Sequence, residues 1–131
     1  MVEKTNVTKW SIENIPDKDD LYYRMHKMYF EDNPNIIPGS GFRPQGESLS
    51  VDWNKHSTPE QSRQRATIPD DNRIVETNVG DVRAIPLIVI HNPDHARMNR
   101  AHTDILGLIG VSKSELNKLR SQLATLSDWA I

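Results

Sequence analysis

Three of the five histidines of this chain lie within residues 89–105, in the stretch VIHNPDHARMNRAHTDI. His91 and His95 are four residues apart, the spacing at which two imidazoles on one helix face can reach the same zinc ion. Asn92 and Pro93 lie between them, and a proline disfavours helical geometry for the residue before it. We therefore expect a turn here, with His91 and His95 as loop residues and no metal site.

A second group of polar side chains comes from three alternating segments, LYYRMH (21–26), SLSVDW (48–53) and RIVETNV (73–79). Period-two alternation indicates half-buried strands. If the strands are neighbours, one face presents Arg24, His26, Ser48, Ser50, Asp52 and Glu76. A guanidinium binds phosphate, a hydroxyl can orient a ribose, and a carboxylate can stabilise an oxocarbenium-like transition state. The alternative interpretation is a solvated sheet face with cross-strand charge pairs.

The order Arg24, Ser50, Glu76 on three successive strands resembles ADP-ribosyltransferase-like folds, which bind NAD. Tyr23-Arg24 also resembles the early Tyr-Arg strand of RES-type toxins. The resemblance covers residues 21–76 and implies NAD as the cofactor, with Arg24 on phosphate, Ser50 near ribose and Glu76 as a catalytic residue. His26 is a second catalytic candidate on that face. The chain departs from the family's pattern because Glu76 stands in VETNV, without a Glu-x-Glu or Gln-x-Glu.

More of the chain is similar to small uncharacterised bacterial single-domain proteins. The matching segments are, in order, LYYRMH, FRP, SLSVDW, STPE, GDVRAI, IHNPDH and NRAHTDILG. Those proteins share a Tyr-Arg-x-x-His start, a Ser-Val-Asp strand, a Pro-Glu helix start and a late Asn-x-Ala-His stretch; in this chain the start reads Tyr23-Arg24-Met25-His26. The resemblance implies one bacterial domain in which a set of polar residues belongs together as a ligand site: Arg24, His26, Ser50, Asp52, Asn99 and His102.

The segments between these residues predict how they are positioned. Residues 31–47 hold three prolines and three glycines, so we expect a long irregular loop. A short surface helix is expected near 57–67, capped either by Ser57 with Glu60 or by Thr58 before Pro59.

Three further elements follow. VRAIPLIVI (82–90) is a near-continuous apolar run, typical of a strand covered on both faces, and 100–110 reads as another strand. Near 112–127, Ser112 and Glu115 fit an N-terminal cap, and leucines recur at helical spacing: Leu116, Leu119, Leu123 and Leu126. The pattern predicts an α+β fold, a mostly antiparallel sheet with a C-terminal amphipathic helix on one face.

Composition limits the classes of function. With 131 residues we expect a single domain, 1–131, in which residues 1–20 form an irregular N-terminal segment. The chain has no cysteine, which excludes disulfides and zinc-thiolate sites. The longest apolar stretch, 85–90, is far too short to cross a bilayer, and we expect a soluble cytoplasmic protein with no membrane partner. A formal net charge of −2 argues against nucleic acid as a partner. A local basic surface stays open, built from the arginines Arg63, Arg65, Arg73, Arg83, Arg97 and Arg100.

The leading hypothesis is a binding or interaction module with a polar sheet face, no cofactor, and an unknown protein or small polar ligand as its partner. It rests on the absence of any specific catalytic motif. The alternatives are an NAD- or nucleotide-using ADP-ribosyltransferase-like enzyme and a nucleic-acid-associated protein.

Overall fold

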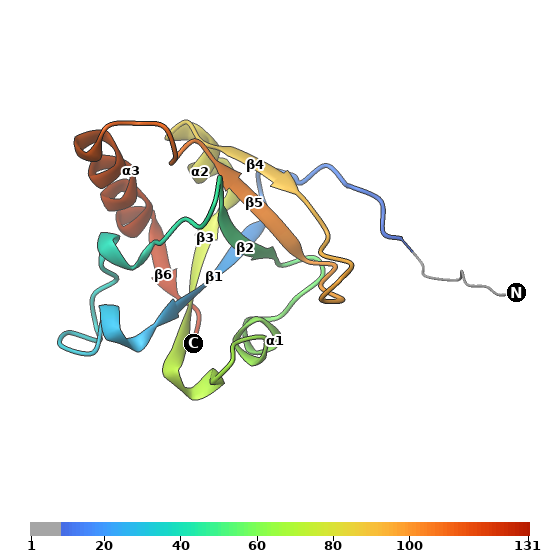
Figure 1. Cartoon of the computed structure of the whole chain (residues 1–131), viewed down its shortest axis with the longest axis horizontal. Helices are drawn as coiled ribbons and strands as arrows, with labels where there is room; N and C mark the ends of the chain where they lie inside the picture. Colours follow the sequence, from blue (N-terminus) through green and yellow to red (C-terminus); the bar gives the residue numbers. More distant parts are fainter. Residues whose placement is uncertain (1–8) are drawn as a thin grey trace, which may run out of the picture.

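A computed structural model describes residues 9–131, which form a six-stranded sheet with helices on both faces (Figure 1). The strand order is β4-β5-β2-β1-β3-β6, and each neighbouring pair is antiparallel. The strands are β1 (Asp20–His26), β2 (Leu49–Trp53), β3 (Asn72–Asn78), β4 (Ile88–His91), β5 (His102–Leu106) and β6 (Ser127–Trp129). The helices are α1 (Pro59–Gln64), α2 (Val79–Ala84) and α3 (Lys113–Leu126). The predicted α+β class is confirmed.

The three alternating segments are neighbouring strands, as predicted, with β1 between β2 and β3. On β1, Leu21, Tyr23 and Met25 are buried in the main apolar core, while Arg24 is exposed on the opposite face. The period of two along a strand therefore separates a core face from a polar face. The polar face is the one on which the candidate site residues lie.

Helix α3 covers the core face of the sheet beside β3 and β6 (Figure 1). Its N-terminus is capped as predicted, because the Ser112 hydroxyl accepts a hydrogen bond from the Glu115 backbone N–H at 3.1 Å. Leu119 and Leu123 are buried in the core, whereas Leu126 at the end of the predicted stripe is exposed. The buried apolar stripe of α3 is therefore shorter than the leucine spacing indicates.

Helix α1 lies on the polar face, where it contacts β1 and β3. Of the two predicted caps, Thr58 before Pro59 is the one observed, and its capping-box partner is Gln61. Ser57 instead points inward and is buried. The helix is shorter than predicted, ending at Gln64.

The prediction of a doubly covered strand over 82–90 is right only for its last part, since β4 spans Ile88–His91, and wrong for its beginning and for the double cover. Residues 79–84 form α2, because the Asn78 side chain caps its first turn and the buried Val79 and Val82 lie on one helix face. Strand β4 starts only at Ile88 and is an edge strand. Val89 and His91 are buried on one of its faces, whereas Ile88 and Ile90 are exposed on the other. Strand β6, which pairs with β3, was not predicted, because three residues carry too little pattern.

The N-terminal segment has no regular helix or strand from residue 9 to residue 19, as predicted, and residues 1–8 lie outside the described part of the chain. The loop 31–47 is irregular apart from a short 3-10 helix at Gly39–Gly41. None of the helices described over residues 9–131 has the length and apolarity needed to cross a bilayer.

Gly41 packs this loop against the core. A Cβ at this position would clash with the Sδ and Cε atoms of the fully buried Met25, and the Gly41 carbonyl accepts a hydrogen bond from the Tyr23 hydroxyl at 2.8 Å. We expect Gly41→Ala to lower the free energy of unfolding by about 1–3 kcal/mol, because the core must shift to admit the methyl group. Urea unfolding measures this. The neighbouring exposed change Ser40→Ala should stay within about 0.5 kcal/mol, and equal effects of the two changes would contradict the packing argument.

Candidate functional site

The candidate site lies where β1 and β2 separate. Strand β1 pairs with β3 along its whole length, but with β2 only at Leu21–Trp53 and Tyr22–Asp52. Along its other edge, β2 pairs with β5 from Leu49 to Asp52. Beyond the Tyr22–Asp52 pair the two strands diverge, and residues from both line a cavity of about 770 Å³. We call it the arginine cavity. Its other walls come from residues 43–45, 65–68, 71–72 and 94–99.

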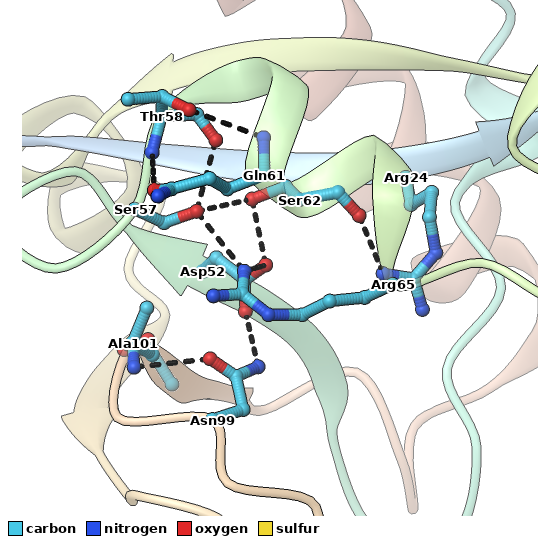
Figure 2. Close-up of polar contacts among 10 residues, drawn as sticks. Arg24, Asp52, Ser57, Thr58, Gln61, Ser62, Arg65, Asn99 and Ala101 are labelled. Atoms are coloured by element: carbon cyan, nitrogen blue, oxygen red, sulfur yellow. Dashed lines mark hydrogen bonds and ion pairs between the residues drawn. The ribbon is translucent and has the colours of Figure 1, made fainter.

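Asp52 holds two of these walls together (Figure 2). One carboxylate oxygen, Oδ2, accepts hydrogen bonds from the Ser62 hydroxyl at 2.7 Å and from Arg65 Nη1 at 2.8 Å. The other, Oδ1, accepts from Asn99 Nδ2 at 2.9 Å. Ser57 completes the group, since its hydroxyl lies 2.8 Å from that of Ser62 and accepts from Arg65 at 3.0 Å. A strand, a helix and a loop are thereby fixed around one buried carboxylate.

This network changes how two predicted ligand residues are understood. Asp52 and Asn99 are only 5% and 7% exposed, and they are hydrogen-bonded to each other. They position the cavity walls, and their hydrogen-bonding groups are already used. Sequence reasoning missed Ser57, Ser62 and Arg65. The one usable signal was that Ser62 and Arg65 are three residues apart, close enough to face the same strand from one helix.

The free positive charge of the cavity comes from Arg24 and Arg43. The cavity has four arginines and three aspartates in its lining, and each aspartate is paired: Asp52 with Arg65, Asp71 with Lys27 and Asp94 with Arg97. Arg24 instead donates to the Ser62 carbonyl at 3.0 Å, and the Arg43 guanidinium lies over the Tyr29 ring at 5.7 Å. Within residues 9–131, neither guanidinium forms an ion pair with a carboxylate. The cavity therefore has unneutralised charge for an anion.

His26 and His102 line the cavity with fixed ring orientations. His26 Nδ1 accepts from the Met28 backbone N–H at 3.0 Å, so in a neutral ring the proton is on Nε2. His102 Nδ1 lies 2.8 Å from the Asn92 carbonyl oxygen and must donate to it, which leaves the lone pair of a neutral ring on Nε2. Four residues along β1 and two strands across the sheet separate the two histidines, a Cα distance of roughly 15 Å. They lie at different ends of the cavity lining.

Ser50 lines the cavity with an exposed hydroxyl, but Glu76 is not part of the lining. Glu76 pairs with Tyr22 from the β3 side, on the far side of β1 from the place where β1 and β2 diverge. Burial raises the pKa of Glu76, and the nearby carboxyl groups of Asp20 and Asp128 raise it further. Of the predicted set, the structure brings together Arg24, His26, Ser50, Asp52, Asn99 and His102, and leaves Glu76 apart.

His91 is not the loop residue that we expected, because it ends β4 and is only 1% exposed. Its Nδ1 accepts from the Glu13 backbone N–H at 3.0 Å, and its Nε2 lies 2.7 Å from the Arg100 carbonyl oxygen. Burial lowers the pKa of His91, in keeping with a neutral ring. His95 is a loop residue, as predicted.

Glu13, His56 and His91 bring three potential metal-ligand atoms within 4.8 Å of one another. Their surroundings do not suit a cation. Both ring nitrogens of His91 are already hydrogen-bonded, and the Glu13 carboxylate is paired with Lys55, His56 and Arg100. The cluster is a hydrogen-bonded anchor for the N-terminal segment.

The chain matches no family model, and no curated protein or solved structure is detectably similar to it. Functional inference therefore rests on the geometry of the arginine cavity.

Proposed function

We propose that this chain is a small binding module whose arginine cavity takes a small polar ligand carrying a phosphate or a similar oxyanion. One observation carries the proposal: Arg24 and Arg43 line a cavity of about 770 Å³ without a carboxylate partner among residues 9–131. A guanidinium pairs with phosphate through two parallel hydrogen bonds, and it keeps its charge at every physiological pH. The volume is within the range of small-molecule sites.

The other lining groups favour a ligand that also has hydroxyl or amide groups. Ser50 and Gln45 are exposed in the cavity, and His26 and His102 offer a donor and an acceptor at distant points of it. A phosphorylated sugar or a nucleotide presents both an anion and such polar groups. The resemblance to small bacterial proteins supports a bacterial origin, and a cytoplasmic location belongs to the same proposal.

We do not extend the proposal to ADP-ribosyl transfer. The resemblance assigned catalysis to Glu76, which lies outside the cavity that contains Arg24 and Ser50. NAD stays in the proposal only as one phosphate-bearing ligand. A nucleic-acid surface gains little support either, because most of the arginines considered for it are paired with carboxylates: Arg63 with Glu60 and Asp70, Arg65 with Asp52, Arg83 with Asp17, and Arg97 with Asp94.

A panel of ligands tests the proposal by isothermal titration calorimetry at low ionic strength. The panel holds inorganic phosphate, pyrophosphate, ribose 5-phosphate, ADP and NAD, with ribose and adenosine as uncharged controls. We expect at least one phosphate-bearing member to bind saturably, and its affinity to fall as salt is raised, because screening weakens charge pairs at an exposed cavity. The uncharged controls should not bind. Binding of adenosine as tight as that of ADP would contradict the proposal.

A further inference from the structure

The N-terminal segment 9–15 is held against the domain by two separate anchors. At its outer end, the Trp10 backbone N–H donates to His95 Nε2 at 2.8 Å, and the Trp10 indole stacks on the same imidazole with ring centroids 5.2 Å apart. Three residues later, the Glu13 carboxylate meets His56 at 2.6 Å and also pairs with Lys55. The first anchor depends on a neutral imidazole, whereas the second depends on charge.

The two anchors differ in their sensitivity to acid. An imidazole nitrogen accepts a hydrogen bond only when it is unprotonated, so a proton on His95 Nε2 would face the Trp10 N–H and remove that bond. Imidazoles ordinarily titrate near pH 6.5. Hydrogen bonds from Lys55 and His56 lower the pKa of Glu13 to about 2, so its carboxylate stays charged throughout that range.

We propose that His95 is an acid-sensitive latch: a proton on its Nε2 releases Trp10, while Glu13 keeps the rest of the segment anchored. The charged groups around the latch are few. Lys9 precedes Trp10, and the loop that contains His95 also contains Asp94 and Arg97, which pair with each other at 3.5 Å. No carboxylate within residues 9–131 forms an ion pair with His95 that would hold an imidazolium in place.

The latch bears on the arginine cavity because His95 belongs to the loop 94–99. This loop lines the arginine cavity with Asp94, Arg97 and Asn99. A backbone bridge between Asp94 and Asn99 joins the two ends of the loop. Release of Trp10 removes the contact that holds the outer side of a cavity wall. This consequence rests on the proposed function, but the latch itself does not, because it can be tested without a ligand.

Amide hydrogen exchange measured by NMR tests the latch, with rates corrected for the intrinsic effect of pH. From pH 7.5 to pH 5.0 we expect the protection of the Trp10 amide to fall by about tenfold or more. The Glu13 amide, which donates to His91 Nδ1, should stay protected because burial lowers the pKa of His91 and keeps its ring neutral. The amides of β1 should stay protected as well. Equal protection of Trp10 at both pH values would overturn the proposal.

Two variants of His95, with one control variant, separate the effect of the latch from a general effect of acid on the fold. His95→Phe keeps an aromatic ring for the stack but has no acceptor, so Trp10 should be unprotected already at pH 7.5. His95→Gln offers a carbonyl oxygen that does not titrate, so the protection of Trp10 should not change with pH. His26→Gln, outside the latch, should respond as the wild type does. Protection of Trp10 in His95→Phe equal to that of the wild type at pH 7.5 would also overturn the proposal.

Discussion

Replacing Asp52 with alanine is expected to lower the free energy of unfolding by about 3 kcal/mol or more, the largest loss that we expect from any one polar substitution. The change leaves Arg65, Ser62 and Asn99 without their shared acceptor in a buried setting. An unpaired buried donor costs about 1–3 kcal/mol, and a buried charge costs more. The Arg65 side chain is 29% exposed and can turn partly to water, which keeps the expected loss at the lower end for a broken buried pair. Urea unfolding at pH 7 measures the change.

The matched control is Asp70→Ala. Asp70 also accepts a hydrogen bond from an arginine, Arg63, at 3.2 Å, but its side chain is 94% exposed. An exposed pair of this kind contributes little, and we expect a change below about 0.5 kcal/mol. If Asp52→Ala and Asp70→Ala had similar effects, Asp52 would not be the element that holds the cavity walls together.

Replacing Arg24 or Arg43 with alanine is expected to weaken binding of the tightest ligand of the panel by about tenfold to a hundredfold each. A hydrogen bond to a charged group contributes about 1.5–3 kcal/mol, and each 1.4 kcal/mol corresponds to about a tenfold change in the dissociation constant. Both side chains are exposed, so the variants should fold. Arg24→Lys and Arg43→Lys should recover only part of the affinity, since an ammonium group lacks the two parallel donors.

The control for this pair is Arg63→Ala. Arg63 lies on α1 but binds Glu60 and Asp70 and is not part of the cavity lining. We expect its removal to leave the dissociation constant within about twofold of the wild-type value, because distant charges are screened at moderate salt. A loss of affinity in Arg63→Ala as large as in Arg24→Ala would mean that binding follows overall charge and not the cavity.

The sequence predicted which side chains share the polar face of the sheet, but it did not predict the separation of β1 from β2 that shapes the site. Alternation in β1, β2 and β3 places Arg24, Ser50 and Asp52 on one face, because the period of a strand is a local property. The separation of β1 from β2 after Tyr22 depends on how each strand pairs on its other side. Pairing of that kind involves residues far apart in the chain, and local patterns do not encode it.

Arg43 shows the same limit. It lies in a loop rich in proline and glycine, where no periodicity indicates the direction of a side chain. Its place in the cavity follows from Gly41 and Tyr23: the Tyr23 hydroxyl donates to the Gly41 carbonyl and accepts from the Arg43 backbone N–H at 2.9 Å. The misassigned segment 82–84 has another cause, since the buried Val82 suits a short helix and a buried strand equally well.

The position of a bound phosphate group tests the central claim most directly. A crystal structure of the protein grown with pyrophosphate at a saturating concentration should show phosphate oxygens within about 3 Å of both the Arg24 and the Arg43 guanidinium groups. Pyrophosphate bound elsewhere on the protein, or an arginine cavity that holds only water under these conditions, would contradict the account.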